Sequence, residues 1–400
     1  MGCRYALSDH PNQGGKRVSE KPYKGLKVVD LTTTIAGPYC TRLLADLGAE
    51  VIKVEAPEGD MMRSRPPMRD GHSNPFGQLN AGKHSVVLDL KSVEGVEAVR
   101  KLAAQADLLV ENFRPGVTAR LGIDYPKLAA SNPRLIYCSI SGYGQTGPSA
   151  GAPAYAPVVH AASGYDRAHL SYQEEGRDRP DWCGIFTADV LSGLYAFAAI
   201  GPALHLRERT GRGQLIDVSM LESMLSLCLN EVQFAQAGGS PVRMFGPTKT
   251  ADGYVMAAVA SEKSFVTLCE AAGRPELARD PRFEDYMERR RNWPKFVEEL
   301  EKWSTTLSTA ECMAVFDRFG VPASPYRTVA EVLHDPQLEH RHALATVSDP
   351  GGEYKVMNAP FRISGADVTV GRHVPGLGEH TREVLASLGL RPLDEDLSGG

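Results

Sequence analysis

The stretch from Lys27 to Glu55 constrains the fold more than any other part of the chain. It contains a short apolar strand, Lys27–Leu31, a turn of small residues, a helix over 39–47, Gly48, and a second strand over 49–55. A strand, a helix, a glycine and a strand in this order form a βαβ unit with parallel strands. The sequence therefore predicts a Rossmann-like α/β fold. The dinucleotide fingerprint G-x-G-x-x-G is absent from the first turn, which argues against NAD or FAD.

The same pattern recurs further along the chain. Short apolar strands alternate with helical segments, and we expect these strands over 86–90, 108–112, 135–140 and 214–219. Two of them run directly into polar, glycine-rich residues, Phe113–Gly116 and Ser141–Gly144. Ligands of open α/β sheets bind outside the carboxyl ends of the strands, so both ends are candidate binding sites. Residues 57–82 show no periodicity, which predicts a long loop with a function.

The length of 400 residues predicts two domains. The turn residues Gly238–Pro241 break the pattern, and after them come a strand over 253–259 and three helices. We therefore expect a Rossmann-like large domain and a smaller α+β domain. The predicted boundaries are a flexible tail over 1–22, the large domain over 23–237 and 325–400, and the small domain over 238–324.

Composition excludes several classes of protein. The net charge is −5 and no basic tract occurs, so nucleic acid is not an expected partner. No apolar run reaches the length of a membrane span, and no membrane association is expected. The seven cysteines are scattered without a C-x-x-C pair, which indicates reduced thiols in a cytoplasmic protein and no metal site.

One carboxylate stands out from its surroundings. Asp189 follows Thr187 at the start of an apolar helix rich in small residues, which we expect to end near Leu206. Thr187 is the expected N-cap, and the field of the helix dipole favours the ionised form of an acid in the first turn. An ionised carboxylate beside an apolar pocket can act as a nucleophile. Acids at helix starts also serve as simple caps, and the residues alone leave both roles open.

Taken together, these stretches resemble the family III CoA-transferases, which include the α-methylacyl-CoA racemases. The resemblance covers the chain from Leu26 to Leu390, and its specificity comes from the joint order and spacing of several motifs. These are Leu43–Glu55, Gly59–Asp60, Asn80 with Lys83, Leu88–Lys91, Glu111–Gly116, Ser141–Gly144, Asp189 with Gly193, Gly211–Ser219, Thr250–Gly253 and Pro375–Leu385.

The resemblance implies a mechanism. Asp189 matches the family's catalytic aspartate, which attacks an acyl-CoA thioester to give a mixed anhydride and then an enzyme-bound CoA thioester that passes CoA to an acceptor acid. The family forms an interlocked homodimer, in which two monomers are threaded through each other. Coenzyme A is therefore the expected cofactor, bound as an acyl-CoA substrate without a metal. The residues in or near stretches that contact CoA in the family are Arg63, Lys83, Asn112, Phe113, Arg120 and Tyr143.

Some of these residues have an alternative role that is only structural. Arg63 and Arg120 could form surface salt bridges, and Phe113 could be a core residue. A non-catalytic CoA-binding protein, with Asp189 only a cap, is a further alternative to an enzyme. The acyl pocket could be shaped by the polar segment 172–181 together with Met61, Met62, Met68, Tyr143 and Tyr155. Arg177 or Arg179 could pair with the distal carboxylate of a dicarboxylate.

Two departures from the family narrow the prediction. The histidine of the racemase branch falls on Tyr155, and a phenol is a poor base for an α-proton at neutral pH. His160 lies five residues later and is either part of the substrate pocket or a structural histidine. The loop over 243–249 holds one glycine, whereas the oxalate-type enzymes carry a glycine run there. We therefore expect an acyl-CoA:carboxylate CoA-transferase, with a racemase or isomerase that uses Asp189 in an acid/base role as the alternative.

Overall fold

The structure is a computed structural model that describes residues 20–173, 176–239 and 241–390. The chain forms two compact units, and the boundary between them crosses the chain four times. The first unit comprises Met1–Pro153, Asp189–Ser219 and His342–Gly400, and the second comprises Ala154–Ala188 and Met220–Arg341.

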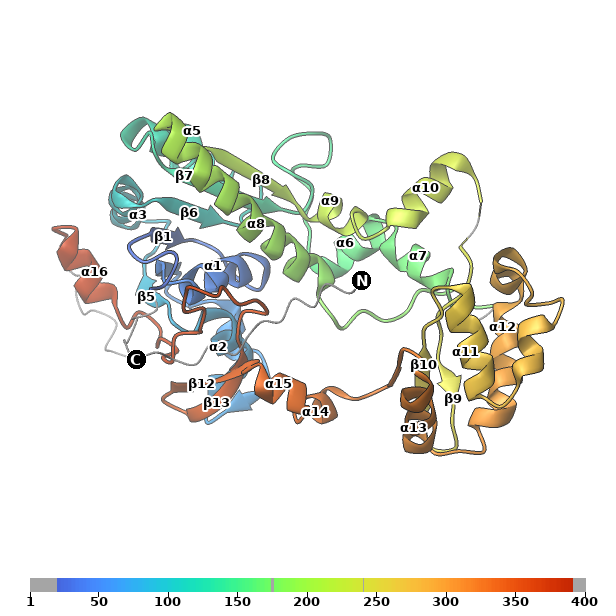
Figure 1. Ribbon diagram of the computed structural model, residues 1–400. Helices are drawn as coiled ribbons and strands as arrows, with labels where there is room; N and C mark the ends of the chain where they lie inside the picture. Colours follow the sequence, from blue (N-terminus) through green and yellow to red (C-terminus); the bar gives the residue numbers. More distant parts are fainter. Residues whose placement is uncertain (1–19, 174–175, 240, 391–400) are drawn as a thin grey trace. The chain divides into compact units, whose positions relative to one another are not determined.

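A six-stranded parallel sheet forms the centre of the first unit (Figure 1). Its strand order is β5-β2-β1-β6-β7-β8. When these six strands alone are numbered in chain order, the order is 3-2-1-4-5-6, which is that of a doubly wound sheet. The predicted parallel α/β sheet is therefore confirmed. The strands are β1 (Lys27–Asp30), β2 (Glu50–Glu55), β5 (His84–Val87), β6 (Leu108–Glu111), β7 (Ile136–Ser141) and β8 (Leu215–Ser219).

Helices and short hairpins complete the first unit. The helix α16 packs against β5 at the edge of the sheet (Figure 1). The helical elements are α1 (Ala36–Asp46), η1 (Met61–Ser64), α2 (Asn74–Asn80), α3 (Val93–Gln105), α4 (Val117–Leu121), α5 (Tyr125–Ser131), α8 (Thr187–Thr210) and α16 (Thr381–Ser387). Two antiparallel pairs join β3 (Met68–Arg69) to β4 (His72–Ser73) and β12 (Leu344–Asp349) to β13 (Gly352–Met357).

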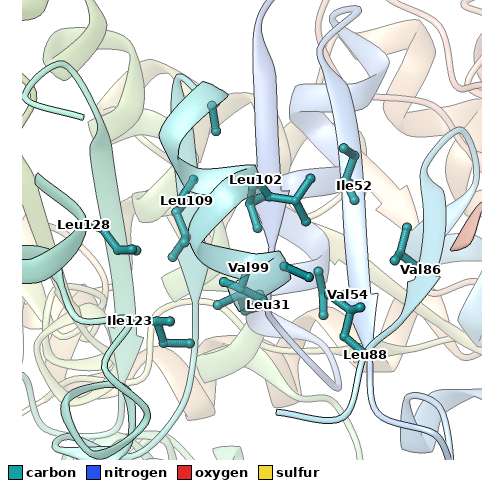
Figure 2. Packing of buried hydrophobic residues seen from close by; sticks show 14 of the residues in the cluster. Leu31, Ile52, Val54, Val86, Leu88, Val99, Leu102, Leu109, Ile123 and Leu128 are labelled. Atoms are coloured by element: carbon teal, nitrogen blue, oxygen red, sulfur yellow. The ribbon is translucent and has the colours of Figure 1, made fainter. Parts of the chain in front are cut away.

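One hydrophobic core of the first unit lies between the sheet and α3. In Figure 2, Leu31, Val54 and Leu109 from the side of the sheet lie near Val99 and Leu102 of this helix. Val99 and Leu109 are fully buried. Near-continuous apolar strands of this kind are typical of parallel sheets covered on both faces.

The helix α8 is the longest in the described chain. One face of this helix is buried, because positions of 8% exposure or less recur every three or four residues. They are Ala188, Ser192, Ala196, Ile200, Ala203 and Arg207. Arg207 Nη1 donates to Asp107 Oδ1 at 2.8 Å. With 24 residues and a window of mean hydropathy 1.3, α8 is the one described helix long and apolar enough to cross a membrane. A core helix meets the same criteria, so this finding alone does not indicate a membrane.

The second unit combines a small antiparallel sheet with helices. Its sheet has the order β11-β10-β9, and its core centres on Phe265, Phe283, Trp293 and Phe296. The strands are β9 (Thr248–Lys249), β10 (Tyr254–Ala257) and β11 (Ala323–Pro325). The helices are α6 (Ala156–Ala162), α7 (Tyr165–Leu170), α9 (Met220–Leu225), α10 (Leu229–Ala237), α11 (Glu262–Ala271), η2 (Pro275–Arg279), α12 (Tyr286–Ser304), α13 (Thr309–Phe319), α14 (Val329–Val332) and α15 (Pro336–His340).

The two units do not have the predicted domain boundaries. The second unit also contains 154–188, because α6 packs against α9 across a long sequence separation that no local pattern reports. The predicted loop 57–82 holds η1, the β3–β4 hairpin and α2, elements too short for a periodic signal. Most of the predicted flexible tail, 1–22, lies outside the described residues.

Candidate active site

The strand order reverses between β1 and β6, and polar residues lie at this position. Thr33 and Asn112 follow these two strands. The Thr33 backbone N–H donates to Asn112 Oδ1 at 3.0 Å, and Asn112 Nδ2 donates back to the Thr33 carbonyl at 2.9 Å. Ligands of doubly wound sheets bind in the crevice at such a switch point. Asn112 thus fixes the geometry of a candidate ligand site.

Two buried ion pairs support the turn after β1. Lys83 Nζ donates to Asp30 Oδ2 at 3.0 Å, and Lys53 Nζ donates to Asp60 Oδ2 at 2.9 Å, with all four side chains buried. Burial alone would raise the pKa of Asp30, but Lys83, Lys53 and two hydroxyl donors lower it to about 2. Burial lowers the pKa of Lys83 to about 8, against the opposing attraction of Asp30. Removal of one partner would leave an uncompensated buried charge.

The turn itself carries backbone strain. Thr34 has φ of 72°, a left-handed conformation that is rare for a β-branched residue. Its N–H donates to both carboxylate oxygens of Asp60 at 3.3 Å, so the buried acid holds the strained residue. Strain that the surroundings enforce is frequent at functional sites.

The start of α1 offers free backbone donors. The N-cap, Ile35, makes no side-chain cap hydrogen bond. No described residue accepts from the N–H of Ala36 or Gly37, and Pro38 has no N–H. The positive end of the helix dipole adds to these donors, so this turn can stabilise a developing negative charge.

The catalytic candidate lies on the helix that packs here. A Cβ at Gly193 of α8 would lie 2.3 Å from the Ala36 carbonyl oxygen, so only glycine permits this close contact with the start of α1. Asp189 precedes Gly193 by one helical turn and shares its face of α8. Asp189 therefore lies on the side of α8 that packs against the start of α1, where the free donors are.

The Asp189 carboxylate has no compensating partner. It is half-buried, and within the described chain it makes no hydrogen bond or ion pair. Burial raises the pKa of Asp189 to about 6. The helix field favours the ionised form, but desolvation has the larger effect on the pKa here. At neutral pH the carboxylate is still mainly ionised but poorly hydrated, which suits a nucleophile.

A second buried acid lies after the neighbouring strands. Glu111, at the end of β6, accepts from the Phe113 N–H at 2.8 Å and from the Ser139 hydroxyl. Burial raises its pKa to about 7, and Asp217 contributes in the same direction. The sequence marked Glu111 only as part of a motif, because its partners come from another strand. The cluster fixes Phe113, which is half-buried against the core.

The other predicted CoA contacts differ in accessibility. Lys83 is 1% exposed and donates to four acceptors of the protein itself. Arg63 donates to both carboxylate oxygens of Glu55, stacks on Phe76 and lines a cavity of about 220 Å³. Arg120 is exposed on α4, and Tyr143 is half-buried after β7. Their contacts with CoA stay predictions.

The second unit holds the remaining candidates. Tyr155 is the N-cap of α6 and is 63% exposed, whereas His160 is 2% exposed. Thr187, the expected N-cap of α8, is instead its first helical residue. Arg177 pairs with Asp181, which leaves its guanidinium less available to a substrate.

Arg179 lies over the ring of Trp182 with its Cζ 5.4 Å from the ring centroid. The described residues contain no group of three or more His, Cys, Asp or Glu side chains suited to hold a metal ion.

Comparison with known proteins identifies the family of this chain. Residues 23–381 match the model of CoA-transferase family III. The chain is 36% identical to succinyl-CoA:mesaconate CoA-transferase of Haloarcula hispanica, over 91% of this chain and 96% of the relative. It is 34% identical to succinyl-CoA:glutarate CoA-transferase of Mus musculus, over 92% of this chain and 86% of the relative.

Two solved structures have the same fold. A CAIB/BAIF family protein from Brucella suis aligns with a TM-score of 0.80 and 36% identity, over 92% of this chain and 100% of that one. A hypothetical protein from Mycobacterium tuberculosis aligns with a TM-score of 0.83 and 30% identity, over 92% and 99% of the two chains.

A doubly wound sheet with an uncompensated carboxylate beside its switch point is thus found in a protein that resembles CoA-transferases throughout its length. The chain belongs to CoA-transferase family III. Enzymes of this class use CoA thioesters as substrates, and the resemblance stated from the motifs is confirmed.

Proposed function

We propose that this protein transfers CoA from an acyl-CoA to a carboxylic acid, with Asp189 as the covalent nucleophile. The observation that carries the proposal is the half-buried Asp189 carboxylate, which has a raised pKa and no partner among the described residues. An acid that only capped its helix would gain hydrogen bonds from the first turn. The ionised form of this acid is poorly hydrated and lacks compensating hydrogen bonds, which makes it a more reactive nucleophile.

The steps balance as follows. The Asp189 carboxylate attacks the thioester carbonyl, the C–S bond breaks, and CoA thiolate leaves a mixed anhydride of the acyl group and Asp189. The thiolate then attacks the Asp189 carbonyl, which releases the donor acid and forms an aspartyl-CoA thioester. An acceptor carboxylate repeats these steps in reverse and leaves as its CoA thioester. Each addition places negative charge on an oxygen, which the free N–H groups of Ala36 and Gly37 can stabilise.

The names of the relatives suggest the class of substrate. The two compared above act on succinyl-CoA with mesaconate or glutarate, and a relative from Acetobacter aceti is an acetyl-CoA:oxalate CoA-transferase. We propose succinyl-CoA as a donor and a short dicarboxylic acid as the acceptor. We further propose that the protein acts in the cytoplasm as an interlocked homodimer, as its family resemblance implies.

The racemase alternative finds less support in the geometry. A base for an α-proton needs a free lone pair within reach of the substrate. Both ring nitrogens of His160 contact other groups of the protein, and the side chain is 2% exposed. We therefore do not assign His160 as a base.

An exchange assay tests the proposal. Purified protein is incubated with succinyl-CoA and a library of short dicarboxylic acids, and new CoA thioesters are detected by mass spectrometry. We expect transfer to at least one acid, loss of transfer in Asp189→Asn, and normal transfer in Asp317→Asn, a variant of an exposed aspartate on α13. Equal activity in Asp189→Asn and wild type would refute the nucleophile. Exchange of α-protons with D₂O without an acceptor acid would favour racemisation.

A further inference from the structure

His160 is a buried residue that links two segments of the second unit. Its Nε2 accepts a hydrogen bond from the Ala188 backbone N–H at 3.0 Å. Its Nδ1 lies 3.1 Å from the sulfur of Cys183, and the Cys183 thiol lies 3.5 Å from the Ile185 carbonyl. His160 lines a cavity of about 240 Å³ with residues of α7 and with 181–187.

These contacts determine the proton positions on the ring. A backbone N–H can only donate, so the Nε2 that accepts from Ala188 carries no proton. A neutral imidazole then has its proton on Nδ1, from which it donates to the Cys183 sulfur. The thiol proton can in turn reach the Ile185 carbonyl. A neutral ring of this tautomer is therefore compatible with all three of these contacts.

The acceptor role of His160 occurs at the start of α8. Ala188 is the second residue of this helix, and its N–H is one of the donors that a helix leaves unpaired at its start. A Ser, Thr, Asp or Asn at the N-cap usually accepts from such a donor. The residue that precedes α8 is Phe186, whose side chain has no acceptor. An imidazole from α6, remote in sequence, therefore takes the place of a local cap.

We propose that His160 is a positioning residue, which fixes the first turn of α8 and thereby the orientation of the Asp189 carboxylate. This inference rests on the proposed nucleophilic role of Asp189. Asp189 is bonded directly to Ala188, so a change in the direction of the Ala188 peptide reorients the next side chain. Displacement of a reacting group by about 1 Å can lower a rate on the order of 100-fold. The effect should fall on kcat, since His160 has no free group to bind a substrate.

The surroundings keep the ring neutral. Burial lowers the pKa of His160, while the carboxylate of Asp166 opposes this shift. Tyr165, at a ring distance of 5.9 Å, and the thiol of Cys183 are the other titratable groups beside it. Protonation would put a proton on Nε2 and remove the acceptor from Ala188. The arrangement of α8 is thus expected to persist at neutral pH and to be lost only in acid.

The tautomer can be measured without any assay of activity. In wild-type protein labelled with ¹⁵N-histidine, the chemical shift of each imidazole nitrogen reports whether it carries a proton. We expect a protonated Nδ1 and an unprotonated Nε2 for His160 at pH 7.5, assigned by the loss of these signals in His160→Gln. A protonated Nε2 would overturn the inference whether or not the protein transfers CoA.

A matched pair of substitutions tests the positioning role. The amide oxygen of glutamine can occupy the place of Nε2 and accept from Ala188, whereas the shorter asparagine reaches only the place of Nδ1. We expect His160→Gln to keep kcat within about 3-fold of wild type, and His160→Asn to lower kcat by about 10- to 100-fold with little change in KM. His169→Gln is the control, because it alters an exposed histidine that lines the same cavity.

The possible results distinguish a failure of the positioning role of His160 from a failure of the proposed CoA transfer. Equal kcat values for His160→Asn and wild type would overturn it, as would equal losses in the glutamine and asparagine variants. If His160→Asn does not fold, His160→Met serves as a second variant without the acceptor, with the same expected loss of kcat. Absence of CoA transfer in wild type would refute the proposed function, while the nitrogen shifts would still report on the contact to Ala188.

Discussion

Asp30 and Asp189 are two desolvated carboxylates whose surroundings shift their pKa values in opposite directions. Asp30 is fully buried at the end of β1, with Lys83 and two hydroxyl groups as partners, and its pKa falls to about 2. Asp189 is half-buried at the start of α8 without a partner among the described residues, and its pKa rises to about 6. Burial alone therefore does not define a reactive acid. The absence of compensation does, because it leaves the ionised form high in free energy.

The two carboxylates also have different roles within the first unit: Asp30 contributes to stability, and Asp189 is the proposed nucleophile. The Asp30–Lys83 and Lys53–Asp60 pairs stabilise the turn that precedes α1, and their donors are consumed by the protein itself. Asp189 stabilises nothing of this kind. Proteins often retain locally unfavourable groups at functional sites, at some loss of stability. Substitutions at the two positions should therefore have opposite effects on activity and stability.

The largest effect is expected on turnover. Asp189→Asn removes the nucleophile with little change in shape, and we expect kcat for CoA transfer to fall by on the order of 10⁴-fold or more, as for other covalent nucleophiles. Steady-state assays of the purified variant check this. A loss of less than about 10-fold would mean that Asp189 does not form the intermediate.

The second largest effect is expected on stability. Asp30→Asn leaves Lys83 as an unpaired buried charge, which should lower the free energy of unfolding by about 3–5 kcal/mol. Urea denaturation measures the change. In Asp30→Asn/Lys83→Met no buried charge is left unpaired, and much of the loss should be regained. If the double variant is no more stable than Asp30→Asn, the unpaired charge of Lys83 is not the cause of the lost stability.

The pH dependence should be of intermediate size. Only the ionised Asp189 attacks, so kcat/KM should rise about tenfold per pH unit below a pKa of about 6 and level off above it. Glu111, with a pKa of about 7, provides a comparison, because Glu111→Gln should leave this acidic limb in place. A limb centred near pH 4 would indicate that Asp189 is not desolvated in the free enzyme.

The smallest effect is a gain of stability at the active site. The pKa of Asp189 is about 6 in the folded protein, whereas its ordinary value is 3.8. The native state therefore binds the carboxyl proton more tightly than the unfolded state does. Stability is then lost as the pH rises between these values, and the loss is complete above pH 6. Asp189→Asn should unfold with a free energy about 1 kcal/mol higher at pH 7.5, and this gain should vanish below pH 4. A variant less stable than wild type at pH 7.5 would contradict the picture.

The sequence was sufficient for features that depend on local patterns. The βαβ unit at Lys27–Glu55 and the helix after Thr187 appear close to their predicted positions, because each has a strong period and clear end signals. The joint order and spacing of the motifs between Leu43 and Leu385 also led to the correct family.

Other features depend on contacts between distant parts of the chain. The assignment of 154–188 to the second unit, the pairing of Thr33 with Asn112, and the acceptor that His160 provides to Ala188 join residues with no common periodicity. The raised pKa of Asp189 could not be predicted for a related reason, since the helix field can be read from the sequence while desolvation depends on tertiary packing.

Trapping the covalent intermediate tests the central claim most directly. Wild type and Asp189→Asn are incubated with succinyl-CoA, treated with hydroxylamine, digested and analysed by mass spectrometry. We predict a hydroxamate at Asp189, in the peptide that contains Gly184–Ala196, only in wild type and only after exposure to the acyl-CoA. Efficient CoA transfer by wild type with no modification of Asp189, or with the hydroxamate on another residue, would contradict the account.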